Sequence, residues 1–306
     1  MHVQNEVAVY LNYCEFHKKL DTKTIKAYRI DLSQFITQLG LEGEVELTKE
    51  KISHYIAALH SQYAPKTAKR KIATLRAFFN YLEFEDILEH NPLRKIRTKF
   101  REPQMLPRTI PLKIIENLLS HMHENCQNSQ SSHRDCTVLR DLVILELLFI
   151  TGARVSELCT LKSENIDLEH GVIHIMGKGA KERIIQIGNA QVLDLLKQYS
   201  SARKNCTSSE TYFFLNRLGT RLSEQSVRVM LRKACQDSCV SIKITPHMFR
   251  HSFATLLLEE DVDIRYIQKM LGHSSIQTTQ IYTQVTSEKQ KQILTTKHPR
   301  NKIFVE

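Results

Sequence analysis

The stretch VLRDLVILELLFITGARVSELCTL, residues 138–161, decides the fold of the larger part of this chain of 306 residues. Residues 138–150 are apolar on nearly every side of a helix, with few charged exceptions. A helix that is apolar all round is buried, so we predict that 138–150 is the central helix of a domain. The sequence Thr-Gly-Ala-Arg at 151–154 breaks this helix, and a new helix is predicted over 155–161.

A small sheet is predicted after this stretch. Val-Ile-His-Ile-Met at 172–176 and Arg-Ile-Ile-Gln-Ile at 183–187 are typical of strands. Gly-Lys-Gly-Ala-Lys at 177–181 joins them as a hairpin, because its glycines allow unusual backbone angles. A further short strand is predicted over 212–215, and the chain beyond residue 223 is predicted to be mostly helical.

Before the central helix, the pattern predicts a helix over 112–122 and a polar surface loop over 124–136. Further back, a proline-rich and basic segment marks a linker between domains. We therefore predict a first domain at 1–97, a linker at 98–110 and a second domain at 111–306. The cations of the linker region that we expect to contact a polyanion are Arg97, Lys99 and Arg101.

The first domain is predicted to be a compact four-helix unit. Apolar residues recur at helical spacing, and the helix boundaries carry typical signals. These signals are Asp21 and Thr22 at an N-cap position, Gly40 as a stop, Thr48 as an N-cap and Pro65 near the start of the fourth helix. The whole chain is thus predicted to be mainly α with a small β-sheet or hairpin, its second domain being α+β.

A basic surface is expected on the first domain. Lys and Arg exceed Asp and Glu by 43 − 33 = 10, and residues 51–82 contain no acidic residue. An ordinary solvated face is the simpler interpretation of such a run, but the absence of acidic neighbours favours contact with phosphates. The expected contacts are Lys66, Lys69, Arg70, Lys71 and Arg76.

Composition excludes several classes of protein. The N-terminus lacks the plan of a signal peptide, and the longest strongly apolar run, 142–150, is too short to span a bilayer. The seven cysteines are scattered and odd in number, which favours reduced thiols and a cytoplasmic location. No phosphate-binding glycine loop, dinucleotide fingerprint or Gly-x-Ser-x-Gly motif is present.

The segment Thr-Pro-His-Met-Phe-Arg-His at 245–251 is the most informative for chemistry. Its Thr-Pro start predicts a helix N-terminus, with His247 and Arg250 on one face, where an oxyanion can bind. An ordinary surface ion pair of Arg250 is the alternative. A metal site at His247 and His251 is not expected, because the zincin pattern requires a glutamate where Met248 stands. No cofactor is expected.

Further along, Leu-Gly-His at 271–273 places His273 in a turn after a helix predicted over 264–270, and Tyr282 follows nine residues later. Taken alone, both side chains are most simply structural. Together with Thr-Gly-Ala-Arg-Val-Ser-Glu-Leu at 151–158, His-Met-Phe-Arg-His at 247–251 and Thr-Thr-Gln-Ile-Tyr-Thr at 278–283, they resemble the tyrosine recombinases, the phage integrase family. The likeness is closest to the Xer-type recombinases and covers nearly the whole chain.

The resemblance implies an N-terminal core-binding domain and a C-terminal catalytic domain that cuts and rejoins DNA through a 3′-phosphotyrosyl intermediate, without metal or ATP. Its catalytic residues would be Arg154, Lys178, His247, Arg250, His273 and the nucleophile Tyr282. Lys181 is the alternative to Lys178 in the same turn, and Glu157 is expected to orient Arg154 or to pack beside it. Such chemistry suits these residues: arginines and histidines stabilise the charge that develops on a phosphodiester, and a lysine protonates the leaving 5′-hydroxyl.

The implied partner is double-stranded DNA with a specific recombination site, bound by a homotetramer or by a pair with a related recombinase. No membrane partner is expected. The apolar residues 303–305 near the C-terminus suit docking onto a neighbouring protomer or back onto their own domain. The polar segment 124–136 departs from the Xer pattern, which leaves open whether the chain serves a mobile element or chromosome dimer resolution. A type IB topoisomerase and a catalytically silent DNA-binding protein are the other interpretations.

Overall fold

The computed structural model describes residues 2–41, 47–96, 108–128, 132–177, 182–204 and 211–272. The chain divides into two compact units, Met1–Gln104 and Met105–Glu306, and each is described by itself. The division falls within the residues for which we predict a linker, 98–110. The linker cations Arg97, Lys99 and Arg101 lie outside the described residues.

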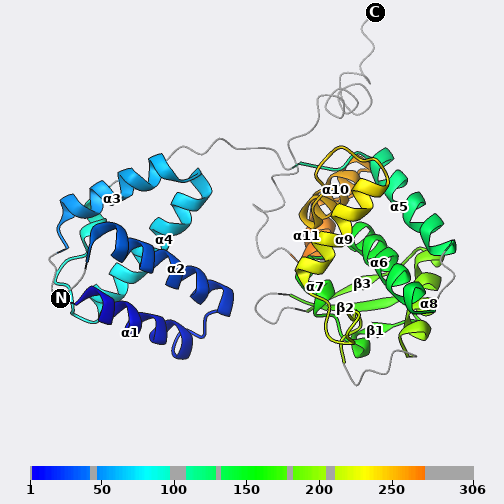
Figure 1. Cartoon of the computed structure of the whole chain (residues 1–306), viewed down its shortest axis with the longest axis horizontal. Helices are drawn as coiled ribbons and strands as arrows, with labels where there is room; N and C mark the ends of the chain where they lie inside the picture. The colour runs from blue at the N-terminus through cyan, green and yellow to red at the C-terminus, as the bar shows by residue number, and fades with distance from the viewer. Residues whose placement is uncertain are drawn as a thin grey trace, which may run out of the picture. The chain divides into compact units, whose positions relative to one another are not determined.

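The first unit is built from four α-helices and a 3₁₀ turn (Figure 1). They are α1 (Val3–Phe16), α2 (Thr22–Leu39), α3 (Lys49–Gln62), α4 (Pro65–Phe84) and η1 (Pro92–Lys95). The predicted caps are confirmed: Asp21 accepts a hydrogen bond from the backbone of Lys23 at 2.7 Å, and Thr48 caps α3. Gly40 ends α2 with a φ of +59°, which glycine adopts without strain.

Aromatic side chains hold these four helices together. Phe35 of α2 is fully buried and meets Tyr55 of α3 and Phe79 of α4 edge-on, with ring centroids 5.1 and 6.1 Å apart. Tyr10 of α1 packs on Phe78 of α4 at 5.3 Å. Each buried aromatic ring contributes about 1.5–3 kcal/mol to folding, so this cluster fixes the helices of the unit against one another.

The second unit combines helices with one three-stranded antiparallel sheet of order β1-β2-β3. Its elements are α5 (Leu112–Gln127), α6 (Ser132–Thr151), α7 (Val155–Cys159), η2 (Ser163–Asn165), β1 (Ile166–Asp167), β2 (Val172–Met176), β3 (Glu182–Gln186), α8 (Ala190–Lys204), α9 (Glu224–Asp237), α10 (Pro246–Glu259) and α11 (Ile264–Leu271). Ile173 pairs with Ile185 and both are buried. The predicted class, mainly α with a small sheet, is confirmed.

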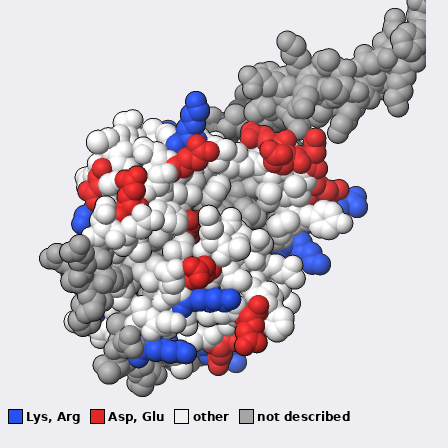
Figure 2. All heavy atoms as spheres, turned by 90° about the vertical axis from the view of Figure 1, so that its right-hand side faces the viewer, with Lys and Arg blue, Asp and Glu red and all other residues white. Residues whose placement is uncertain are grey.

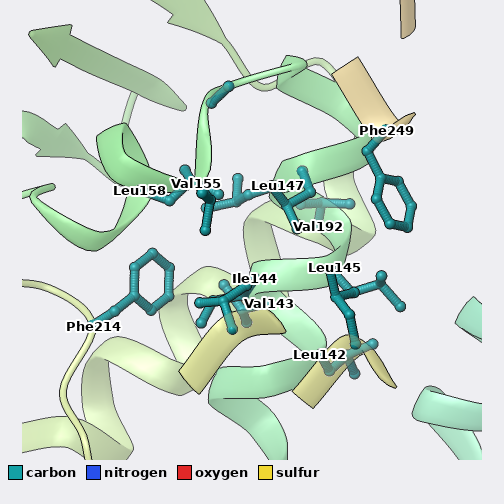
Figure 3. Packing of buried hydrophobic residues seen from close by; sticks show 14 of the residues in the cluster. Leu142, Val143, Ile144, Leu145, Leu147, Val155, Leu158, Val192, Phe214 and Phe249 are labelled. Atoms are coloured by element: carbon teal, nitrogen blue, oxygen red, sulfur yellow. The ribbon is translucent and has the colours of Figure 1, made fainter. Parts of the chain in front are cut away.

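Helix α6 lies at the centre of the second unit, as predicted. Its fully buried apolar side chains include those of Leu142, Val143, Leu145, Leu147 and Leu148. Helices α5, α8, α9 and α10 pack around it, and Figure 3 shows side chains from neighbouring elements converging on it. Among the described segments, no helix combines the length and the apolar composition needed to cross a bilayer.

Two expectations about this unit are wrong. The predicted loop over 124–136 is mostly helical, since α5 continues to Gln127 and α6 begins at Ser132. The polar residues there extend two helices whose apolar positions lie elsewhere, and polarity alone does not end a helix. The predicted strand over 212–215 forms only isolated bridges of Tyr212 and Leu215, and the sheet instead gains β1.

Two contacts bring the ends of these helices together. Gly152 connects α6 to α7 with a φ of +56°, and a β-carbon there would lie 2.7 Å from Cδ1 of Phe253 and 2.9 Å from Cδ2 of Leu271. The residue must therefore be glycine for both backbone and packing reasons. Separately, the backbone N–H of Ile110 donates to Oγ of the buried Ser252 at 2.7 Å, which attaches the chain before α5 to helix α10.

Replacing Gly152 by alanine should lower the free energy of unfolding by about 2–4 kcal/mol, because the left-handed backbone disfavours a β-carbon and Phe253 has to move. Thermal unfolding of the full chain measures this. Gly188→Ala is the matched control, since a β-carbon at Gly188 meets nothing within 4 Å. Equal melting temperatures for the two variants would contradict the account of the turn.

Candidate active site

The structure brings together three of the six predicted catalytic residues. Arg154 lies at the start of α7, and His247 and Arg250 lie in the first turns of α10. Lys178, His273 and Tyr282, together with the alternative Lys181, lie outside the described residues. For these the prediction from sequence stands as made.

Arg154 is fixed by the carboxylate of Glu157. Its Nη1 donates to Oε1 of Glu157 at 2.7 Å, and its backbone N–H donates to Oε2 at 2.8 Å. The expected orientation of Arg154 by Glu157 is therefore confirmed. The side chain of Arg154 is still 35% exposed, so it presents positive charge at the surface while one of its N–H groups is held below.

A second arginine, Arg183 of β3, meets the same carboxylate, and no motif in the sequence singles it out. Nη2 of Arg183 lies 2.7 Å from Oε2 of Glu157, and Nη1 lies 3.0 Å from Oε1. Burial alone would raise the pKa of Glu157, but the hydrogen bonds and charge of Arg183 and the hydrogen bonds of Arg154 outweigh it and hold that pKa below its ordinary value. Glu157 is thus an anion that draws two cations together.

Arg250 is a buried residue, 5% exposed, that binds two backbone carbonyls. Its Nη1 donates to the carbonyl of Gly152 at 2.8 Å, and its Nη2 donates to the carbonyl of Leu271 at 2.6 Å. The alternative of an ordinary surface ion pair does not describe it. These bonds place its guanidinium between the turn that precedes Arg154 and the end of α11, where Leu271 begins the Leu-Gly-His motif at 271–273.

His247 lies among cations. Desolvation lowers its pKa, and the charges of Arg250, Arg228 and Arg154 lower it further, whereas Glu224 opposes the shift. The imidazole is therefore kept neutral near neutral pH, so it can accept a proton or donate a hydrogen bond. The pKa of His251 is lowered too, again first by desolvation.

Arg228 of α9 is a further cation near this site that sequence reasoning missed. It pairs with Glu224 at 3.0 Å, four residues earlier on the same helix. Such a pair looks in sequence like an ordinary solvated helix face, and only the packing of α9 beside α7 brings it near His247. Within the described residues, no group of three metal-binding side chains occurs.

The basic surface expected on the first unit is partly corrected. Lys66, Lys69, Arg70 and Arg76 are exposed on α4. Lys71 is only 2% exposed, and its Nζ lies 3.1 Å from Oδ1 of Asp31. Lys71 is therefore a buried residue and not one of the side chains that can contact DNA at the surface.

The partner of Lys71 comes from another helix. Asp31 of α2 also pairs with Arg70 and accepts a hydrogen bond from Thr74 at 3.0 Å. Residues 51–82 contain no acidic residue, but the fold brings Asp31 of α2 against α4. The sequence of 51–82 alone therefore overestimates the positive charge that α4 presents to a partner.

Charge on the second unit is mixed on the side shown in Figure 2. Acidic clusters and single Lys or Arg side chains alternate there among the described residues. This side faces the viewer when Figure 1 is turned by 90° and includes the neighbourhood of α5 and α8. It does not resemble a continuous basic surface, in contrast to the cations that gather around His247.

Comparison with known proteins decides the family. The sequence profile described as phage integrase family matches residues 108–289, and that of the phage integrase N-terminal SAM-like domain matches residues 7–86. The chain belongs to the phage integrase family. A protein named tyrosine recombinase from Agathobacter rectalis is 50% identical over 298 residues, 97% of each chain, and tyrosine recombinase XerD of Listeria monocytogenes is 36% identical over 95% of this chain and 97% of its own.

Solved structures agree in fold with this family. The XerH site-specific recombinase, crystallised with its palindromic difH substrate in a post-cleavage complex, matches with a TM-score of 0.74 and 22% identity over 93% of this chain and 83% of its own. A crystal structure of XerA recombinase matches with a TM-score of 0.54 and 26% identity over 97% and 99% of the two chains. The chain is a Xer-type tyrosine recombinase in sequence and in architecture.

The position of His247 predicts its titration. In the DNA-free protein its pKa should lie below the usual value of about 6.5. Because the unfolded state then binds the proton more readily, His247 should make the protein less stable as pH falls through about 6.5 and below. Arg228→Gln should raise the pKa of His247, since a repelling charge is removed and Glu224 remains.

NMR titration of the histidine ring resonances measures this. Arg232→Gln is a matched control on the same helix, because Arg232 is not among the charges that lower the pKa of His247. A pKa at or above 6.5 in the native protein, or an equal rise in both variants, would contradict the arrangement of cations described for the site.

Proposed function

We propose that this recombinase cuts and rejoins DNA at a specific site, with Tyr282 as the nucleophile and with Arg154, Lys178, His247, Arg250 and His273 as the other catalytic residues. The observation that carries the proposal is the meeting of Arg154, Arg250 and neutral His247 at the ends of α6, α10 and α11. In the sequence, His273 follows Leu271, whose carbonyl Arg250 binds, by two residues.

The proposed reaction starts with attack of the Tyr282 hydroxyl on a DNA phosphorus atom. A phenol has an ordinary pKa near 10, so attack at neutral pH needs a proton acceptor and a positive field. Neutral His247 can take the phenol proton. Arg154 and Arg250 stabilise the negative charge that grows on the non-bridging oxygens, as preorganised donors do.

As the bond from phosphorus to the 5′ oxygen breaks, that oxygen needs a proton, for which Lys178 is the proposed donor. The 3′-phosphotyrosyl bond retains the energy of the phosphodiester. The 5′-hydroxyl of another strand can therefore attack it, restore Tyr282 and complete exchange without ATP. Lys181, from the same predicted turn, is the alternative proton donor.

Duplex DNA with a specific site is the proposed partner, contacted by Lys66, Lys69, Arg70 and Arg76 and by the linker cations Arg97, Lys99 and Arg101. The active assembly is proposed as a homotetramer or as a pair with a related recombinase, acting in the cytoplasm. Both integration with excision and chromosome dimer resolution fit this chemistry.

Type IB topoisomerases share phosphotyrosine chemistry and are the second candidate class. Relaxation of supercoiled DNA that lacks any recombination site would favour that class. Exchange restricted to one sequence would favour the recombinase, as the family and the separate basic helical unit do.

Replacing Tyr282 by phenylalanine should abolish covalent attachment to DNA while leaving DNA affinity within about threefold, because the change removes only the attacking oxygen. Nicked duplexes with randomised half-sites serve as suicide substrates, and denaturing gels followed by sequencing of protein-linked DNA measure attachment. Tyr266→Phe is the matched control, since Tyr266 is an exposed tyrosine on α11. An adduct formed by the Tyr282 variant would refute the proposed nucleophile.

The triple change Lys66→Gln, Lys69→Gln and Arg76→Gln should weaken binding to duplex DNA at low salt. Each lost phosphate contact should reduce the slope of log K against log salt by about 0.9, so the combined reduction should approach about 3. Fluorescence anisotropy over a salt series measures the slope. An unchanged slope would remove α4 from the proposed DNA surface.

A further inference from the structure

We propose that Arg183 is a positioning residue of the recombinase, which holds β3, the start of α7 and the end of α11 in the arrangement that strand cleavage needs. This inference rests on the proposed function, because the segments that Arg183 joins are those that carry or adjoin Arg154, Lys178 and His273. Arg183 itself is 8% exposed and is not proposed to touch DNA.

The first contact is a bidentate pair with Glu157. Nη1 and Nη2 of Arg183 each meet one carboxylate oxygen, at 3.0 and 2.7 Å. The same two oxygens accept the side chain and the backbone N–H of Arg154, at 2.7 and 2.8 Å. Arg183 therefore fixes the rotation of the carboxylate, and the carboxylate in turn fixes Arg154.

The second contact closes the end of α11. Nε of Arg183 donates to the carbonyl of Met270 at 2.8 Å, and Arg250 takes the next carbonyl, that of Leu271. The last carbonyls of a helix have no partner within the helix, and each arginine supplies a donor to one of them. A β-carbon at Gly272 would lie 3.1 Å from Cδ of Arg183, so the guanidinium stem also packs on the residue before His273.

One planar group thus joins segments that are far apart in sequence. Glu157 lies 26 residues before Arg183, and Met270 lies 87 residues after it. Arg183 is also the second residue of β3, while Met176 ends β2 two residues before Lys178. Displacing a reacting group by about 1 Å can cost about 10²-fold in rate, so a clamp of this kind bears directly on cleavage.

Lysine cannot replace this arrangement. The guanidinium offers five N–H donors in a fixed plane, of which three serve two different partners here, whereas an ammonium is a point charge on a flexible stem. Arg183→Lys keeps the charge beside Glu157 and loses the planar geometry. It therefore separates a role in charge balance from a role in positioning.

The test measures the single-turnover rate of Tyr282-dependent attachment to a saturating nicked duplex carrying the selected site, together with DNA affinity and melting temperature. Arg183→Met should lower the rate about 10²-fold, and Arg183→Lys about 10-fold or more, with DNA affinity within about threefold in both. Arg203→Met is the matched control, because Arg203 also donates to a backbone carbonyl, that of Tyr212 at 2.6 Å, away from the site. The Arg203→Met variant should have a lower melting temperature than the native protein but cleave at the native rate.

A double variant separates positioning from stability. Arg183→Met leaves the Glu157 carboxylate with one guanidinium fewer, and adding Glu157→Gln removes that buried charge and should recover melting temperature. If Arg183 acts through Glu157, the effects of the two single changes on the cleavage rate do not multiply. The double variant then cleaves at about the rate of the slower single variant, even though its melting temperature recovers. A rate that recovers with melting temperature, single effects that multiply, or a native rate in folded Arg183→Met would each overturn the proposal.

Failure of this inference is distinct from failure of the proposed function. If Tyr282→Phe abolishes the adduct and Arg183→Met does not slow its formation, only the positioning role falls. If the native protein forms no adduct that depends on Tyr282, the catalytic assignment itself is wrong.

Discussion

The carboxylate of Glu157, buried between the guanidinium groups of Arg154 and Arg183, is the interaction on which the rest of the candidate site depends. A carboxylate taken out of water loses several kcal/mol of hydration unless charges and N–H donors replace the water. Here four N–H groups from two separate segments replace it. Since each donor is needed, α7 and β3 have little freedom to move apart.

The ends of helices supply the second half of this arrangement. Arg250 and Arg183 bind consecutive carbonyls at the end of α11, and Arg250 also binds the carbonyl of Gly152 after α6. The guanidinium groups of Arg154, Arg183 and Arg250 would otherwise repel one another in a small volume. Backbone carbonyls and one carboxylate offset that repulsion, so the positive charge is assembled before any DNA arrives. The pKa of His247 is lowered first by desolvation and then by the charges of Arg250, Arg228 and Arg154.

Much of this fold could be predicted because its signals are local. The caps at Asp21, Thr48 and Gly40, the apolar stretch of α6 and the strand pattern of β2 each depend on neighbours in sequence. The residues that were missed depend on distant partners instead. The residues around Arg183 do not indicate that it binds Glu157, which lies 26 residues earlier. Likewise, the residues around Lys71 do not indicate that it binds Asp31 on another helix.

Sequence motifs identify the residues to which we assign the proposed chemistry of the site. They do not identify the residues that hold those side chains in place. Arg154, His247 and Arg250 stand in recognisable segments. Arg183 stands in an ordinary strand pattern, and Arg228 in an ordinary helical ion pair. Polarity also misled: the segment 124–136 reads as a loop, yet the structure divides most of it between α5 and α6, because exposed faces of helices are as polar as loops.

The hydrogen bond between Ile110 and Ser252 has a mechanical consequence. Ile110 is among the first described residues after the division between the two units, and Ser252 lies two residues beyond Arg250 on α10. The hydroxyl of Ser252 also lies 3.5 Å from the carbonyl oxygen of Ile110, so one buried side chain engages both polar groups of that residue. The backbone that enters α5 is therefore held directly on the helix that bears His247 and Arg250, and removal of this hydroxyl would leave the buried N–H of Ile110 without its acceptor.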